Sequence, residues 1–192
     1  DNERLTLDDG LLLFSTSHTD YVYYLADLKR KKMVGDTVYY SSTFFTHPTN
    51  LCELSCPMCS FYAKPGWKKA WFDTPEVVEN KIRNVLHHNL SEIHIVGGLW
   101  RDCDLNYYQE LFTRIKSIDS NLHIKALTPV EYDFLSKLHN IPISKVFEIM
   151  ISWGLGSLPG GGAEILNEDI RKKIATGKIT SQEYMNIYEI VH

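Results

Sequence analysis

The sequence lacks long apolar runs and an excess of charge of one sign. Its longest apolar stretches, such as residues 10–14 and 145–151, are far shorter than the roughly 20 residues that a membrane-spanning helix needs, and no signal-peptide pattern opens it. The 20 Lys and Arg against 24 Asp and Glu form no basic stripe suited to a nucleic-acid backbone or an anionic membrane. We therefore expect a cytoplasmic protein that acts on a small-molecule substrate, without a nucleic-acid partner or membrane insertion.

Cysteine is scarce and unevenly placed. Of the 4 cysteines, Cys52, Cys56 and Cys59 lie within eight positions, and Cys103 is distant from them. This is a poor disulfide framework and a good pattern for a metal or cluster site. Because Pro57 disfavours a helix through the segment, we expect the three thiolates on a loop. Cys103 is expected to be an ordinary, small, half-buried residue.

Three interpretations of the clustered cysteines are open. An iron–sulfur cubane held by only three cysteines keeps one iron without a protein ligand, and an open site of this kind indicates chemistry. A structural zinc with His47 as its fourth ligand is an alternative, as are three unrelated thiols. Because the loop follows a predicted strand, at the end where barrel enzymes carry their active sites, the cluster is favoured.

Strand and helix patterns alternate along the chain after a helical opening. The expected strands are residues 37–46, 92–96, 122–127 and 155–158, and the expected helices among and after them are residues 75–89, 106–119, 129–139, 144–153 and one that starts after Thr180. This alternation predicts an α/β fold with a parallel sheet, with half of the eight strands of a closed barrel. We expect residues 1–36 to be a helical lead-in and residues 37–192 to be a partial barrel.

Polar residues share one face of the two middle strands. By the two-residue period of a strand, His94 lies opposite Ile93 and Ile95, and His123 and Lys125 alternate with apolar neighbours. A fully buried parallel strand is almost continuously apolar, so this face predicts a ligand-lined cavity. For each residue taken alone, a hydrogen-bonded structural role is the alternative.

The cysteine loop, Cys52-Glu-Leu-Ser-Cys56-Pro-Met-Cys59, resembles the CxxxCxxC signature of the radical S-adenosylmethionine (SAM) enzymes, which carry it after the first strand of a TIM-type barrel. Residues 49–52, 94–98, 123–128 with Glu131, and 158–164 further resemble the aminofutalosine synthases of the futalosine pathway to menaquinone. The resemblance runs over nearly the whole chain and covers about the first half of a family member.

The resemblance implies a cofactor site. The three clustered cysteines would ligate a 4Fe–4S cluster, and its open iron would bind the amino and carboxylate groups of SAM. Gly97 and Gly98 would bring bare backbone close to the methionine moiety, as glycine allows. Glu164 would bind the ribose hydroxyls.

The resemblance also implies a reaction and catalytic residues. SAM would be cleaved to methionine and a 5′-deoxyadenosyl radical, which adds to 3-[(1-carboxyvinyl)oxy]benzoate and yields aminofutalosine after loss of a carboxylate. His94, Lys125 and Glu131 are the expected catalytic residues, with Lys125 facing a substrate carboxylate, and the reductant would be a donor such as flavodoxin or ferredoxin. The alternatives are a cyclic dehypoxanthine futalosine synthase, a deazaflavin-cofactor synthase, or a non-catalytic zinc or iron–sulfur module.

Overall fold

The computed structural model describes residues 3–192, which belong to two compact units that divide between Tyr40 and Ser41. The first unit contains two helices, α1 (Leu7–Ser15) and α2 (Thr19–Val34). Thr6 and Asp9 start α1 with a capping box, since the Asp9 N–H donates to Thr6 Oγ1 at 3.2 Å and the Thr6 N–H donates to Asp9 Oδ2 at 2.8 Å. The predicted helical opening is therefore present.

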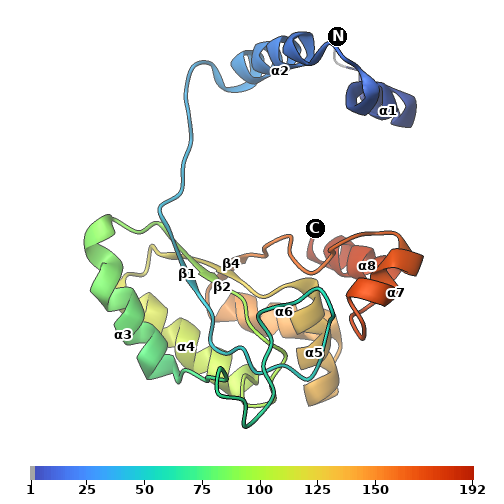
Figure 1. The fold of residues 1–192 in the computed structure, drawn as a ribbon. Coiled ribbons are helices and arrows are strands. Elements are labelled where there is room, and N and C mark those ends of the chain that lie inside the picture. The colour runs from blue at the N-terminus through green and yellow to red at the C-terminus, as the bar shows by residue number, and fades with distance from the viewer. Residues whose placement is uncertain (1–2) are drawn as a thin grey trace. The chain divides into compact units, whose positions relative to one another are not determined.

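The second unit alternates strands and helices around one parallel sheet (Figure 1). Its elements are β1 (Thr43–Thr46), α3 (Pro75–Val85), the short 3₁₀ helix η1 (Leu86–His88), β2 (Glu92–Ile95), α4 (Leu105–Ile118), β3 (His123–Ala126), α5 (Pro129–His139), α6 (Ile143–Ser152), β4 (Leu155–Ser157), α7 (Glu168–Ile174) and α8 (Ser181–Val191). The four strands lie in the order β1-β2-β3-β4, all parallel. The α/β prediction is confirmed. No helix within residues 3–192 is long and apolar enough to cross a membrane.

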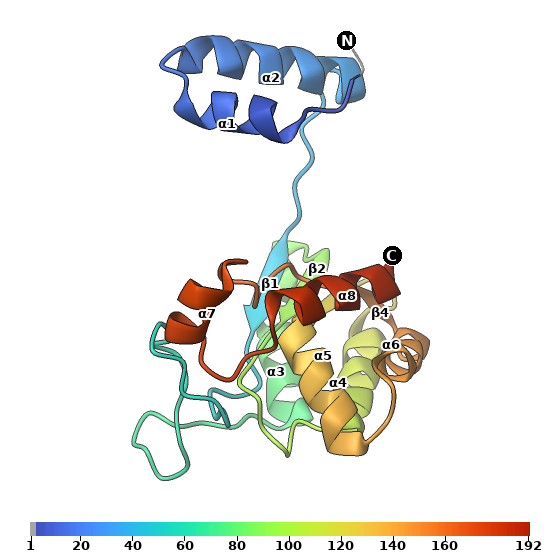
Figure 2. The same ribbon diagram turned by 90° about the vertical axis from the view of Figure 1, so that its right-hand side faces the viewer.

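Helices cover one face of the sheet (Figure 2). The apolar side chains on that face are part of the buried core. Ile93 and Ile95 of β2, and Ile124 and Ala126 of β3, are fully buried, together with side chains of α3, α4, α5 and α6. The polar residues alternate with them: His94, His123 and Lys125 stay partly exposed, and Glu92 at the start of β2 is buried. The predicted division of the two middle strands into an apolar and a polar face is correct.

Two expectations about the elements are wrong. Residues 37–42 form no strand, because the ladder between β1 and β2 begins only at Thr43, opposite Glu92. The sequence analysis also missed α7. Its signals were local: Asn167 caps the helix by accepting from the Ile170 N–H at 3.1 Å, acidic residues occupy its first turn, and basic residues occupy its last, as the helix dipole favours.

The segments that follow β1 and β2 touch each other through bare backbone. The Gly98 N–H donates to the Thr49 carbonyl at 3.0 Å, and the Glu53 N–H donates to the Leu99 carbonyl at 2.9 Å. A Cβ atom on Gly98 would lie 2.0 Å from the Leu51 carbonyl oxygen. Only glycine fits at position 98, because it packs against Leu51, the residue immediately before the first cysteine of the loop.

Replacing Gly98 with alanine is expected to destabilise the fold. The added methyl group must displace the backbone at Leu51, which we expect to lower the free energy of unfolding by about 1–3 kcal/mol. Urea titration measures this change. Gly160→Ala is the matched control, because a Cβ there meets only the Tyr188 hydroxyl at 3.9 Å; equal stability of the two variants would contradict the prediction.

The sheet has two open edges among the described residues, because β1 pairs only with β2 and β4 only with β3. Unpaired strand edges favour association with other chains. Residues 1–192 expressed alone are therefore expected to self-associate, with a mass above that of a monomer by light scattering. A monomeric mass would show that the four strands need no further partner.

Candidate functional site

A cavity of about 280 Å³ lies at the carboxyl end of the sheet. It is lined by segments that follow all four strands. All three clustered cysteines line it, as do Gly97 and Gly98 after β2. Glu131 in the first turn of α5 and Glu164 after β4, two more of the expected site residues, also line it. Residues from distant parts of the chain thus meet at one place.

The cysteine loop is held by backbone hydrogen bonds on several sides. The Leu99 N–H points at Cys52 Sγ over 3.4 Å, and the Cys52 N–H donates to the Ala63 carbonyl at 3.1 Å. The thiol of buried Cys56 donates to the Thr176 carbonyl at 3.5 Å. These contacts fix the cysteines from both the β2 side and the segment that follows α7.

Burial raises the pKa of the Cys56 thiol, while the nearby Lys178 ammonium lowers it. The thiolate is the form that binds a metal, so metal binding at Cys56 releases a proton. Cys103 is more deeply enclosed, and burial raises its pKa to about 12. It lies in the apolar core, 3% exposed and outside the cavity lining, which suits an inert structural thiol.

The structure does not bring His47 to the cysteines. Its Nδ1 is 2.9 Å from the Val96 carbonyl, and it is absent from the cavity lining. Within residues 3–192, no three His, Cys, Asp or Glu side chains converge closely enough to share a single metal ion. An iron–sulfur cluster is wider than one ion, because each cysteine binds a different iron. The geometry thus disfavours the zinc alternative with His47 as fourth ligand.

Glu131 connects the segments that follow β2 and β3. Its carboxylate accepts from the Gly97 N–H at 2.9 Å, from the Thr128 N–H at 2.7 Å and from Thr128 Oγ1 at 2.8 Å. Burial raises its pKa to about 7, against the lowering effect of these hydrogen bonds. In this arrangement the side chain holds the glycine pair in place.

Glu164 forms an ion pair with Lys178, and both side chains line the cavity. Glu164 follows the glycine run of residues 160–162 and has a left-handed backbone conformation, with φ of 58°. The sequence analysis missed Lys178. It follows Gly177 in a turn that carries no motif spacing, so the only sequence signal was a Gly-Lys pair of a kind found in many loops.

His94 and Lys125 lie outside the cavity lining, although His94 shares a strand face with Val96, which lines it. The His94 ring stacks on Phe45 with centroids 4.3 Å apart. Lys125 Nζ donates to the Glu92 carboxylate at 2.8 Å. These polar side chains have partners within the sheet, as the structural alternative predicts.

The two ionisable partners of this face have shifted pKa values. Burial, and then the Lys125 ammonium, lower the pKa of His94, so its imidazole is neutral at pH 7. Burial pushes the pKa of Glu92 upward, but hydrogen bonds from Lys125 and Thr43 more than offset it, and the net pKa is lowered. Lys125 therefore faces an ionised carboxylate.

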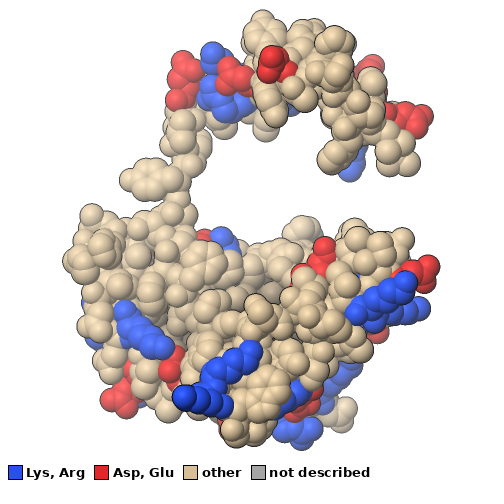
Figure 3. All heavy atoms as spheres, in the orientation of Figure 1, with Lys and Arg blue, Asp and Glu red and all other residues tan. Residues whose placement is uncertain are grey.

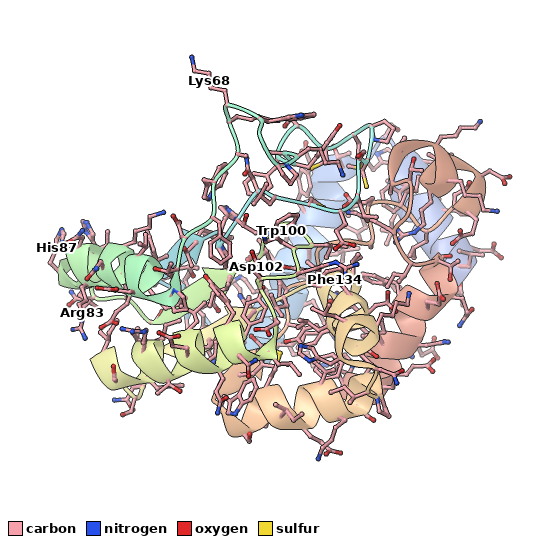
Figure 4. All side chains as sticks on the ribbon, turned by 90° about the horizontal axis from the view of Figure 1, so that it is seen from below. Lys68, Arg83, His87, Trp100, Asp102 and Phe134 are labelled. Carbon is pink, nitrogen blue, oxygen red and sulfur yellow. The ribbon has the colours of Figure 1, made fainter. Side chains whose placement is uncertain are left out.

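Charged side chains on the surface are mixed in sign. Figure 3 shows Lys and Arg interspersed with Asp and Glu on the visible face of the unit Ser41–His192. Near the cavity, Arg101 pairs with Glu53 at 2.8 Å. In Figure 4, Trp100 and Asp102 lie together in the segment after β2, where the indole N–H donates to the Asp102 carboxylate at 3.1 Å.

Several curated proteins are similar to this chain over almost all of its length. Aminodeoxyfutalosine synthase of Thermus thermophilus is 31% identical over 193 residues, which cover 100% of this chain and 52% of that protein. A 5-amino-6-(D-ribitylamino)uracil–L-tyrosine 4-hydroxyphenyl transferase of Methanococcus maripaludis is 29% identical, over 99% of this chain and 54% of its own length. Cyclic dehypoxanthine futalosine synthase of Halalkalibacterium halodurans is also 29% identical, over 96% and 50%. The chain spans about half the length of these relatives.

Solved structures show the same fold. Methylornithine synthase superimposes with a TM-score of 0.74 at 16% identity, covering 98% of this chain and 52% of that one. The FeFe-hydrogenase maturase of Carboxydothermus hydrogenoformans gives 0.68 at 18% identity, covering 98% and 42%. The predicted partial barrel is confirmed as the amino-terminal half of such a fold. Because the sequence pattern of the radical SAM superfamily also matches residues 46–192, this chain belongs to that superfamily.

Proposed function

We propose that this chain is the amino-terminal half of a radical SAM transferase that makes aminofutalosine from 3-[(1-carboxyvinyl)oxy]benzoate. The observation that carries the proposal is the cavity in which all three cysteines of the CxxxCxxC loop meet the glycine pair after β2. The named reaction is supported by the aminodeoxyfutalosine synthases of Thermus thermophilus and Streptomyces coelicolor, at 31% and 30% identity. We place the enzyme in the cytoplasm, with a flavodoxin or ferredoxin as electron donor.

The residues around the cavity fit the cofactors of the superfamily, which are a 4Fe–4S cluster and SAM. Three cysteines supply the thiolate donors that such a cluster needs. At Gly98 a Cβ would strike the Leu51 carbonyl, so the glycine lets the segment after β2 pack directly against the start of the cysteine loop. When bound, the cluster and SAM supply a 5′-deoxyadenosyl radical.

Each lining residue then has a defined task. Cys52, Cys56 and Cys59 hold the cluster, and the backbone at Gly97 and Gly98 receives the methionine end of SAM. Glu131 keeps that backbone in place through the Gly97 N–H. The Glu164 carboxylate accepts hydrogen bonds from the ribose hydroxyls of SAM, and its ion pair with Lys178 restricts its rotamers. The apolar side chains of the lining exclude water from the reacting carbon atoms.

Lys125 binds a carboxylate of the substrate on the polar face of the sheet. A compact ammonium suits this task, and its present partner, Glu92, orients it until substrate arrives. The stacked pair of Phe45 and His94 offers an aromatic ring surface beside it. The neutral imidazole of His94 can donate or accept a hydrogen bond at pH 7.

Turnover assays with different acceptors test the named reaction against its relatives. The full-length protein, reduced anaerobically and supplied with SAM, is expected to consume 3-[(1-carboxyvinyl)oxy]benzoate and form aminofutalosine, followed by mass spectrometry. Turnover of dehypoxanthine futalosine alone, or of tyrosine with 5-amino-6-(D-ribitylamino)uracil alone, would assign the chain to one of the other two reactions. The radical SAM chemistry would stand in either case.

Removal of a clustered cysteine is expected to abolish the iron site. In the full-length protein, Cys52→Ala, Cys56→Ala and Cys59→Ala should each lose the electron paramagnetic resonance signal of a reduced 4Fe–4S cluster, because each removes one of its thiolate ligands. Iron and sulfide analysis under anaerobic conditions gives the occupancy. Adding SAM to the unchanged protein should perturb the signal.

Cys103→Ala is the matched control for these variants. It deletes a cysteine outside the cavity, and the signal and iron content should stay as in the unchanged protein. Stoichiometric zinc in place of iron, or a signal indifferent to SAM, would mean that the cysteines build a closed centre without radical chemistry.

Lys125→Ala is expected to raise the KM for the substrate about tenfold or more, because a hydrogen bond between charged groups is lost. The change also leaves the Glu92 carboxylate without its cation, which can lower the stability of the fold. The double variant Lys125→Met with Glu92→Gln removes both charges, so that a raised KM in it reports lost substrate binding and not an unpaired carboxylate. Lys145→Ala, which changes an exposed side chain of α6, serves as a control. Unchanged KM and kcat in both Lys125 variants would remove Lys125 from the substrate site.

A further inference from the structure

We propose that Lys64 is a positioning residue that fixes the cysteine loop for cluster binding; the inference rests on the function proposed above. Its Nζ donates to three consecutive carbonyls, those of Cys52 at 2.8 Å, Glu53 at 2.8 Å and Leu54 at 3.0 Å. An ammonium has three N–H donors, so all of them are used on this one stretch of backbone. The stretch connects the first cysteine of the motif to the second.

The carbonyl oxygens of residues 52–54 lie around one point, and a hydrogen-bond donor between them satisfies all three. At the end of a helix such carbonyls are orphaned, and a lysine nearby can satisfy them. The loop from Cys52 to Cys56 contains no helix, so its own backbone does not supply the partner. Lys64 holds the three oxygens together and thereby limits how the chain between the two thiols can turn.

The backbone around Lys64 is itself anchored. The Ala63 N–H donates to the Asn50 carbonyl at 2.7 Å, and the Ala63 carbonyl accepts from the Cys52 N–H at 3.1 Å. The Asn50 side chain is buried and donates to the Lys69 carbonyl at 2.9 Å. Lys64 therefore extends from a fixed segment, and its ammonium has a defined position relative to Cys52.

The charge of Lys64 adds a second effect. Its ammonium donates a hydrogen bond to the Cys52 carbonyl. It therefore places a positive charge beside a residue whose thiolate would carry negative charge in a bound cluster. Net charge and hydrogen bonding around a cluster set its reduction potential. A cation there favours the reduced state, so removal of the cation shifts the potential to more negative values.

The same segment provides a matched control. Lys68 lies four residues further along and projects from the tip of its loop, away from the rest of the unit (Figure 4). Lys68→Met removes a positive charge near the cysteine loop without touching its carbonyls. Lys64→Arg keeps the charge but changes the shape of the donor, because a planar guanidinium cannot aim three N–H groups from one nitrogen.

The first measurement is amide hydrogen exchange in the metal-free, full-length protein. Lys64→Met should raise the exchange rates of the Cys52, Glu53 and Cys59 amides about tenfold, as expected when hydrogen bonds to a charged group are lost. Lys64→Arg should raise the same rates, and Lys68→Met should leave them unchanged. This readout needs no cluster and no activity.

The second measurement is cluster retention in the reconstituted protein. We expect a chelator to remove iron about tenfold faster from Lys64→Met, since loss of outer-shell contacts weakens metal sites by this order. Lys64→Met should also shift the midpoint potential to more negative values, whereas Lys64→Arg, which keeps the charge, should not. Lys68→Met should match the unchanged protein in both respects.

Two results would overturn the inference. If Lys64→Met and Lys64→Arg both match Lys68→Met in amide exchange, Lys64 does not order the loop. If the Lys64 variants raise the amide exchange rates but lose iron at the rate of the unchanged protein, the loop contacts have no bearing on the cluster. Failure of the unchanged protein to take up iron would instead refute the proposed function, while the exchange rates of the metal-free protein would still report on Lys64. Should Lys64→Met not fold, Lys64→Arg carries the same comparison.

Discussion

The close approach of Gly98 to the Leu51 carbonyl is the constraint on which the site depends. It locks the segment after β2 against the start of the cysteine loop, with backbone hydrogen bonds from the Gly98 and Glu53 amides. Glu131 extends this contact to β3 by accepting from Gly97 and Thr128. The segments after β1 and β2 are thereby joined through their main chains and those after β2 and β3 through the Glu131 carboxylate, which gives the side chains of the cavity a rigid base.

The polar face of the sheet and the cavity serve different parts of the proposed chemistry. The cavity collects cysteines and exposed backbone, which suit an inorganic cluster and the polar end of SAM. The polar face carries an ion pair between Lys125 and Glu92 and a ring stack between Phe45 and His94. Its side chains are already satisfied by one another, so a ligand must exchange partners with them, which favours ligands that bring their own carboxylate.

Local signals in the sequence predicted the parts of the fold that depend on neighbouring residues. The expected helix starts at residue 75 and after Thr180 are confirmed, with Thr74 and Thr180 as the capping residues, and the cysteine spacing identified the loop. The three carbonyl contacts of Lys64 and the ion pair of Lys178 with Glu164 were not predictable. They join residues that share no period or motif, and only the folded chain brings them together.

The contact between Cys56 and Thr176 closes a span of 120 residues. Closing such a long span costs conformational entropy that local turns do not, and it requires the chain through β4 and α7 to exist. On the ribosome, the cysteine loop emerges early but waits for this distant segment before all its walls are present. The order of synthesis therefore delays completion of the proposed cluster site, so that iron delivered before residue 176 is made would meet a loop without its closing side.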